Sequence, residues 1–296
     1  MLYWKDIARN VVDHVSGTYR YPKKMLGRSA GPGSQTTAAS PVVLVVAAHP
    51  DDEIIAIGGT INRIVQAGTR VIVVFVTNGS RGLPAAVSVE HRVAIRESEA
   101  LEALSAVGVD KRDVSFLGFP DTGCYRYMSL IARDLYGVFQ RYEPEEVYVH
   151  GIEGGHIDHD VIGYVVQRIV EQVSVRNIWE WAEYNGQFPL QSSEIEFPDD
   201  SQNRSERVLL TRVELSQKAI ALQRYESQQL PSECLRSTEI IRRADTATAR
   251  TRFLSMYDAS PFWRVRLRPA CDELEKGIDS VMVNDKDRFR GGGNRL

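Results

Sequence analysis

Short apolar runs alternate along residues 42–184 with longer segments whose apolar residues recur at helical spacing. The runs have strand length and are rich in Val, Ile and Phe, over residues 42–48, 70–77, 113–117, 146–150 and 178–184. Helices are predicted between them, over residues 53–68, 87–107, 128–142 and 158–173. Continuous apolar runs are typical of parallel strands buried on both faces. The alternation therefore predicts an α/β, Rossmann-like fold: a doubly wound, mostly parallel sheet with helices on both faces.

The regions that flank this pattern are less regular. Residues 1–40 are predicted to form an N-terminal helix followed by a polar linker or arm rich in Gly, Ser, Thr and Pro. The main domain is assigned to residues 41–235, with a polar surface loop or lid over 191–206 and a helix over 213–229. Residues 236–296 are predicted to form a less regular C-terminal extension that ends in a flexible, basic tail.

Composition narrows the function classes. The chain has 296 residues, 43% hydrophobic and 25% charged, and a net charge of −3, so no basic field indicates a nucleic-acid partner. It has neither a secretory signal at the N-terminus nor an apolar run long enough for a transmembrane helix. Cys124, Cys234 and Cys271 are odd in number and widely spaced, which fits a reducing cytoplasm. The sequence leaves the oligomeric state open, and a homo-oligomer is compatible with it.

Two segments rich in His and Asp follow predicted strands. Residues 48–53 read Ala-His-Pro-Asp-Asp-Glu and come directly after the first strand, whereas residues 154–159 read Gly-Gly-His-Ile-Asp-His and follow the fourth. In an open α/β sheet, ligands bind outside the carboxyl ends of the strands. We therefore expect the two segments to converge on one point.

Their spacing suits a metal ion. His49 and Asp52 are three residues apart, so a turn that enters a helix can direct both side chains the same way. His159 can complete a set of two histidines and one aspartate. Three protein ligands leave the fourth position of zinc open to water or substrate, which is the pattern of a catalytic site.

The neighbouring residues supply acid–base chemistry. Asp51 is free to take a proton from water, and His156 lies three residues before His159, with Asp158 available to orient an imidazole. A Lewis acid, a general base and a group that stabilises an oxyanion suffice for metal-assisted amide hydrolysis. Each segment also has a simpler interpretation: the first could be an acidic N-cap of a helix, and the histidines of the second could form only local hydrogen bonds. His150, at a strand end, is interpreted as structural rather than catalytic.

The two segments resemble the signatures of the LmbE-like, or PIG-L, family of N-acetylglucosaminyl deacetylases. The first segment is followed by Gly58-Gly59, and the second extends to Glu153-Gly154-Gly155-His156-Ile157-Asp158-His159. Weaker likenesses are an Arg-x-x-Glu pair at Arg96 and Glu99, residues 117–121 and residues 225–228. The resemblance covers roughly residues 42–230.

The resemblance implies a set of roles. Zinc would be bound by His49, Asp52 and His159, and Asp51 would be the general base. His156, oriented by Asp158, would stabilise the oxyanion, while Arg96 and Asp121 would contact substrate hydroxyls or phosphate. The chain departs from the family at Gly154, where some members have a tyrosine that contributes to the oxyanion site, and at Ile157, where proline is usual. The implied reaction is removal of an N-acetyl group from an N-acetylglucosamine-type sugar within a larger conjugate.

The sequence is also compatible with other functions. The same zinc could serve an amidohydrolase acting on a non-sugar N-acyl substrate, and an inactive sugar-binding protein could share the fold. A dinucleotide-binding protein is disfavoured because carboxylates stand where a pyrophosphate would lie. A nucleic-acid binder is suggested only by five arginines between residues 236 and 252, which a solvated helix face or an anionic substrate group explains better.

Overall fold

The computed structural model describes residues 41–184, 195–198 and 204–290, and of residues 279–290 it describes the backbone only. The predicted N-terminal helix and linker, residues 191–194 and 199–203 of the predicted polar loop, and residues 291–296 of the predicted tail lie outside the described residues. The described residues all fall in one compact unit.

A seven-stranded sheet forms the centre of this unit, in the order β3-β2-β1-β4-β5-β7-β6. The first five strands in the chain pair in parallel: β1 (Val42–Ala47), β2 (Arg70–Thr77), β3 (Val114–Phe119), β4 (Glu146–His150) and β5 (Asn177–Trp181). The last two, β6 (Glu206–Leu209) and β7 (Thr238–Arg243), are antiparallel to their neighbours. The predicted Rossmann-like, mostly parallel α/β fold is confirmed.

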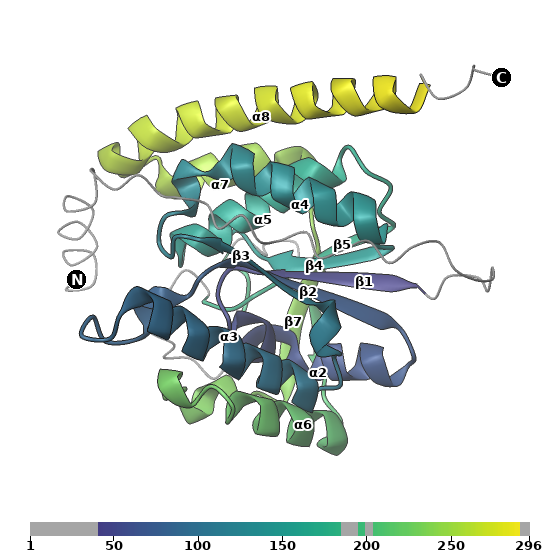
Figure 1. The fold of residues 1–296 in the computed structure, drawn as a ribbon, viewed down its shortest axis with the longest axis vertical. Helices are drawn as coiled ribbons and strands as arrows, with labels where there is room; N and C mark the ends of the chain where they lie inside the picture. Colours follow the sequence, from purple (N-terminus) through teal and green to yellow (C-terminus); the bar gives the residue numbers. More distant parts are fainter. Residues whose placement is uncertain (1–40, 185–194, 199–203, 291–296) are drawn as a thin grey trace. The chain divides into compact units, whose positions relative to one another are not determined.

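Helices cover both faces of the sheet (Figure 1). One face carries α2 (Asp52–Gln66), α3 (Val89–Ala106) and α6 (Arg212–Leu222). The other carries α4 (Met128–Tyr142), α5 (Ile157–Val170), α7 (Ala249–Tyr257) and α8 (Pro261–Arg290). Side chains of a strand point alternately to the two faces. In β1, Leu44 and Val46 therefore join the hydrophobic cluster on the face of α4, α5, α7 and α8. Val43 and Val45 join the cluster on the face of α2, α3 and α6.

The region beyond residue 235 is more regular than expected. It contributes β7, which lies inside the sheet between β5 and β6, as well as α7 and the long helix α8. Helix α8 buries one face, with residues at spacings of three and four: Trp263, Leu267, Cys271 and Leu274. The boundary placed at residue 235 thus falls just before a strand of the sheet. Residues 288–290, which belong to the predicted flexible tail of residues 288–296, are helical.

The strand order places a topological switch point between β1 and β4. From β1 the chain builds β2 and β3 on one side of the sheet and β4 and β5 on the other. Such a reversal opens a crevice at the carboxyl ends of the two central strands. Gly163 lets α5 pack against β4 there, because a Cβ atom at this position would lie 2.6 Å from the His150 carbonyl oxygen.

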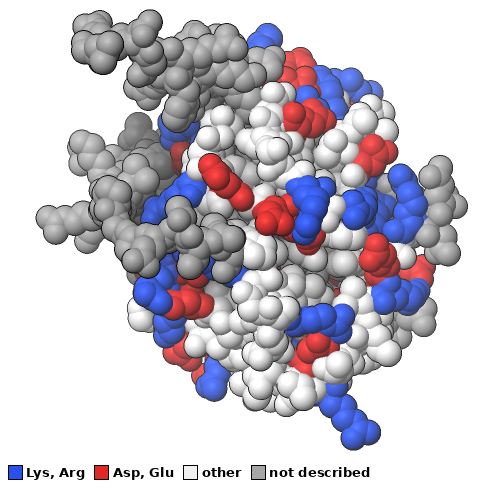
Figure 2. Space-filling model, turned by 90° about the vertical axis from the view of Figure 1, so that its right-hand side faces the viewer, with Lys and Arg blue, Asp and Glu red and all other residues white. Residues whose placement is uncertain are grey.

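Charges of both signs are interspersed over the face of the molecule shown in Figure 2, apart from the residues drawn in grey. This mixture agrees with the net charge of −3 and with the absence of a basic stripe from the sequence. Among the described helices, none combines the length and hydropathy needed to cross a membrane.

Candidate metal centre and active site

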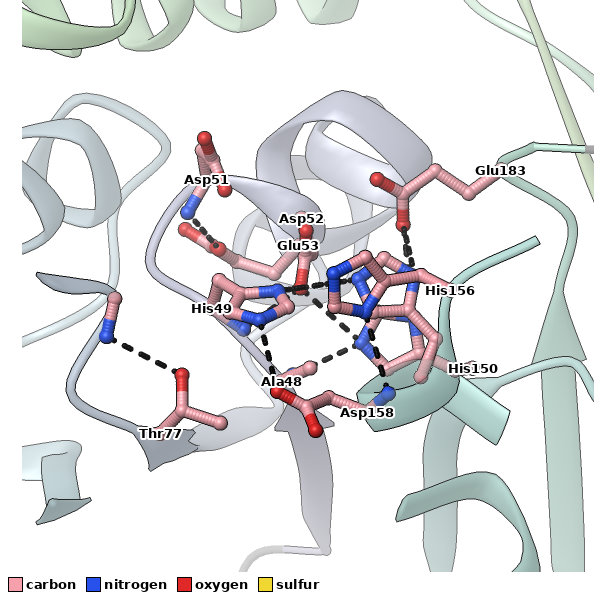
Figure 3. Close-up of polar contacts among 12 residues, drawn as sticks. Ala48, His49, Asp51, Asp52, Glu53, Thr77, His150, His156, Asp158 and Glu183 are labelled. Atoms are coloured by element: carbon pink, nitrogen blue, oxygen red, sulfur yellow. Dashed lines mark hydrogen bonds and ion pairs between the residues drawn. The ribbon is translucent and has the colours of Figure 1, made fainter. Parts of the chain in front are cut away.

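The two predicted segments meet at the switch point. His49 follows β1, and Asp52 begins α2 in the next turn. His156 caps the N-terminus of α5, and His159 lies in the first turn of that helix. Figure 3 shows side chains from both segments directed toward one another, with His150 from the end of β4 beside them.

Three donor atoms form a nearly equilateral triangle. His49 Nδ1 lies 3.2 Å from Asp52 Oδ2 and 3.2 Å from His159 Nε2, and the latter two atoms are 3.3 Å apart. A tetrahedral ion with bonds of about 2.0–2.1 Å separates its ligands by roughly 3.3–3.4 Å. The triangle therefore fits a zinc ion held by three protein ligands.

The carboxylates around His49 also favour the binding of a cation at the triangle. Burial opposes protonation of this imidazole, but the neighbouring carboxylates of Asp52, Asp121 and Asp158 overcome it and raise the pKa of His49 well above its usual value. Although burial alone would raise the pKa of Asp52, the nearby His159 and His49 hold it well below its usual value. A buried site with this excess of carboxylates is stabilised by a bound metal ion.

Carboxylates surround the triangle and contact the second nitrogen of each imidazole. His49 Nε2 lies 3.4 Å from Asp121 Oδ1 and 3.4 Å from Asp158 Oδ2. His159 Nδ1 lies 3.7 Å from Glu183 Oε2. Partners of this kind fix the orientation and tautomer of metal-binding histidines. Three further donor sets share residues with the triangle: one adds His156, one adds His150 and Glu183, and one adds Asp121 and Asp158.

His156 is neutral and has its proton on one defined nitrogen. Its Nδ1 accepts a hydrogen bond of 3.2 Å from the backbone N–H of Asp158, so the proton of the neutral ring is on Nε2. Burial, with His159 and His49 nearby, lowers the pKa of His156 to about 3. Its ring centroid lies 4.8 Å from that of His49 and 4.7 Å from that of His159. His156 therefore offers an N–H donor beside the triangle.

Asp51 is a buried carboxylate whose backbone has a strained conformation. Its φ of 131° is rare for any residue other than glycine, and such strain is characteristic of functional sites. Burial raises the pKa of Asp51 to about 6, although Arg96 acts in the opposite direction. Arg96 lies 3.1 Å from Asp51 Oδ2 and also donates a hydrogen bond to the carbonyl oxygen of Pro50. A carboxylate with this pKa is suited to accept a proton at neutral pH.

Three predicted residues have contacts that differ from the expected ones. Arg96 holds the Asp51 carboxylate rather than facing an open pocket, and its side chain is 2% exposed. Asp121 contacts His49 and accepts a hydrogen bond from the backbone N–H of Arg81. The Asp158 carboxylate also contacts His49, and it is fixed by the backbone N–H groups of residues 122 and 124. In this structure Asp158 contacts His156 through its backbone rather than through its carboxylate.

The weaker sequence likenesses form a supporting layer behind the site. Tyr225 donates a hydrogen bond of 2.7 Å to Glu53, and the backbone and hydroxyl of Ser227 each donate one of 2.7 Å to Glu99. Burial raises the pKa of Glu53 to about 8 in spite of the tyrosine. These bonds join α3 and residues 225–228 to the helix that carries Asp52.

Sequence analysis missed Glu183 and interpreted His150 as structural. His150 Nε2 accepts a hydrogen bond of 2.9 Å from the Ala48 backbone N–H, while its Nδ1 lies 3.5 Å from Glu183 Oε2. Its ring packs against His159, with 3.9 Å between the centroids. The available signal for Glu183 was its place near the carboxyl end of the fifth predicted strand, residues 178–184, at the same sheet edge as the two segments.

These features define an α/β protein with a candidate three-ligand metal centre at its switch point, flanked by a carboxylate base and a neutral imidazole. Residues 44–170 match the model of the family PIG-L, GlcNAc-PI de-N-acetylase, which supports the resemblance predicted from the two segments.

Two relatives named as deacetylases are similar to part of the chain. The probable N-acetyl-alpha-D-glucosaminyl L-malate deacetylase 2 of Bacillus cereus is 33% identical over 137 residues, which cover 44% of this chain and 61% of the relative. The 1D-myo-inositol 2-acetamido-2-deoxy-alpha-D-glucopyranoside deacetylase 1 of Catenulispora acidiphila is 34% identical, with 41% of each chain covered. The chain thus spans less than two thirds of the length of each of these relatives.

A solved structure shows the same fold. The N,N'-diacetylchitobiose deacetylase from Pyrococcus horikoshii superposes with a TM-score of 0.56, at 20% identity, over 71% of this chain and 86% of the other. Given the low identity, this likeness concerns the fold alone.

Proposed function

We propose that this protein is a zinc-dependent hydrolase that removes the N-acetyl group from an N-acetylglucosamine-type sugar in a larger conjugate. The observation that carries the proposal is the donor triangle of His49, Asp52 and His159 with Asp51 and neutral His156 beside it. These three residues would hold the zinc ion. When bound, zinc supplies a Lewis acid that polarises the amide carbonyl.

The chain's own residues move the protons. Asp51, ionised above its pKa of about 6, accepts a proton from water as the water oxygen bonds to the acyl carbon. His156 donates its Nε2–H to the carbonyl oxygen while negative charge develops there. The C–N bond then breaks, and the proton held by Asp51 passes to the leaving nitrogen. The products are acetate and a free amino sugar.

The sugar part of the proposal is supported by the relatives. Their names specify N-acetylglucosamine joined to L-malate and an acetylated glucosamine joined to inositol. A conjugate is expected to be a better substrate than free N-acetylglucosamine, because binding energy from the attached group contributes to catalysis.

A substrate panel tests this proposal. The zinc-loaded protein is given N-acetylglucosamine conjugates, free N-acetylglucosamine, N-acetyl amino acids and aliphatic amides, and released acetate is measured. We expect the highest kcat/KM among the conjugates. If N-acetyl amino acids or aliphatic amides exceed every hexosamine derivative, the sugar assignment is wrong and a zinc amidohydrolase of non-sugar substrates takes its place.

We also propose a reducing, cytoplasmic location. The support is that Cys124, Cys234 and Cys271 are all free thiols in buried positions.

A further inference from the structure

The five arginines between residues 236 and 252 separate into two groups. Four are bound by side chains of the protein: Arg242 and Arg252 pair with Glu180, Arg243 donates to Asn177, and Arg250 pairs with Asp272 and Glu275. Arg236 differs from them. Its side chain is half-buried, and two of its guanidinium nitrogens, Nε and Nη2, are buried with no hydrogen-bond partner among the described residues.

A guanidinium without partners is costly at a buried position. It stays charged at neutral pH, and a buried charged donor that lacks an acceptor loses its hydration without compensation. Burial lowers the pKa of Arg236, whereas Cys234, Glu183 and Glu153 act to raise it. These observations indicate that Arg236 is arranged to meet an acceptor that the described residues do not supply.

Arg236 lines a cavity of about 420 Å³, which we call the Arg236 pocket; its other walls include Ile55, Ala56, Ala182, Thr238 and Ile240. Asp52, Ile55 and Ala56 lie at i, i+3 and i+4 on α2, so one face of this helix carries both a metal ligand and a wall of the pocket. The pocket thus begins about one helical turn, or about 5.4 Å, from Asp52. On the other side, Ala182 directly precedes Glu183.

We propose that the Arg236 pocket binds an anionic group, a carboxylate or a phosphate, on the part of the substrate attached to the amino sugar. This inference rests on the proposed deacetylase function, since it concerns the same substrate. Planar guanidinium donors match the paired oxygens of both groups. Arg236 would then determine which conjugates are accepted without touching the amide that is cleaved.

The other charged residues that line the pocket are either already paired or negatively charged, so Arg236 is the one that can bind an anion there. Glu239 is neutralised by Lys218, at 2.7 Å, and accepts hydrogen bonds from residues 59 and 60. Arg207 is exposed and already pairs with Glu196. Glu233 is exposed at the pocket and would oppose an anion there, so a selective effect of Arg236 must exceed this repulsion.

A matched set of substrates tests the proposal. Three N-acetylglucosaminides share one aglycone that ends in a carboxylate, a phosphate or a neutral carboxamide, and kcat/KM for acetate release is measured for each. The wild-type protein is expected to prefer at least one anionic substrate over the carboxamide by about 10- to 100-fold, the usual range for a charge-assisted hydrogen bond. Which anion is preferred identifies the carboxylate or the phosphate as the natural group.

The variant Arg236→Gln should abolish this preference, because it lowers kcat/KM for the anionic substrates more than for the carboxamide. Arg236→Lys should retain part of it, since the charge remains but the two-pronged geometry is lost. Arg243→Gln is the matched control, because Arg243 is exposed, bound to Asn177 and not part of the pocket. An unchanged preference in Arg236→Gln, no preference in the wild type, or an equal loss for all three substrates would overturn the proposal.

A binding measurement separates this inference from the proposed function. If no substrate releases acetate, the deacetylase proposal fails, and calorimetric titration with succinate and with phosphate then decides the role of Arg236. At least about tenfold weaker binding of one anion to Arg236→Gln than to wild type, both loaded with zinc, supports an anion site. Equal affinity in the two proteins, or no binding to the wild type, contradicts it.

Discussion

One oxygen atom, Oδ2 of Asp52, connects the strands and helices that meet at the metal centre. It accepts a hydrogen bond of 2.7 Å from the His49 backbone N–H and lies 3.2–3.3 Å from ring nitrogens of His49, His150 and His159. These contacts come from the loop after β1, the end of β4 and the first turn of α5. A change at this single position therefore alters the geometry of every ligand of the centre.

In this structure Arg96 contacts the carboxylate of Asp51, the proposed base, and the pH dependence of the rate tests whether its charge acts on that base. Asp51 must be ionised to accept a proton, so kcat/KM should rise with pH through its pKa of about 6. The charge of Arg96 lowers that pKa. Removing the charge in Arg96→Met should therefore raise the pKa of Asp51 and shift the acid limb of the profile to higher pH.

The matched control is Arg92→Met, one helical turn earlier on α3, where the side chain donates to the Ser80 carbonyl oxygen. Its acid limb should stay at the wild-type position. Zinc content is measured in both variants to confirm that the centre is intact. An acid limb in Arg96→Met that stays in place or moves to lower pH would mean that Arg96 does not act on Asp51.

At the scale of elements, a buried ion pair joins three parts of the domain. Lys218 on α6 lies 2.7 Å from Glu239 on β7, and both side chains are 0% exposed. Glu239 also accepts hydrogen bonds from the backbone of Gly59 and from Thr60 on α2. Gly59 also leaves room for the Leu210 side chain beside α2, since a Cβ atom there would lie 2.4 Å from it.

Loss of one partner should therefore destabilise the domain strongly. Lys218→Met leaves the Glu239 charge buried without its cation, which typically costs about 3–5 kcal/mol. Urea denaturation should show this as a lower midpoint with an unchanged slope. The control is Arg112→Met, which removes an exposed ion pair with Asp110 and should leave the midpoint nearly unchanged. Equal midpoints for the two variants would show that the buried pair contributes no stability.

Sequence periodicity predicted the first five strands because β1, β2 and β4 are buried along most of their length, and β3 and β5, although partly half-buried, are still mostly apolar. It failed for β6 and β7 for two different reasons. β6 is a largely exposed edge strand of four residues. β7 lies inside the sheet but carries buried charges, Glu239 and Arg242, each neutralised by a partner far away in the sequence. A strand that buries paired charges cannot be distinguished from a polar loop by its own residues.

The residues of the candidate site likewise divide into those that a local motif reveals and those that depend on distant partners. Its central residues were predictable because two short segments carry them, and each segment directly follows or closely follows a central strand. Glu183 and Arg236 were not assigned to the site, since each is a single charged residue without a local motif. The contacts of Arg96 and Asp121 also depend on long-range packing, which no spacing in the sequence reveals.

At the scale of the whole molecule, the fold brings the candidate metal centre, the proposed base and the proposed oxyanion donor to one crevice of the sheet. The central claim is that this arrangement hydrolyses an N-acetyl group with zinc. This claim requires that metal binding and proton transfer depend on different residues. Asp52 is one of the three proposed ligands, whereas Asp51 is not.

The most direct measurement is zinc-dependent acetate release from an N-acetylglucosamine conjugate by the wild-type, Asp51→Asn and Asp52→Ala proteins, with bound zinc measured in parallel. The wild type should lose activity on chelation and regain it with about one zinc per chain. Asp51→Asn should keep the zinc yet lose turnover by about 10²- to 10⁴-fold, and Asp52→Ala should lose most of the zinc. Full turnover by the chelated wild type, or wild-type turnover by Asp51→Asn, would contradict the account.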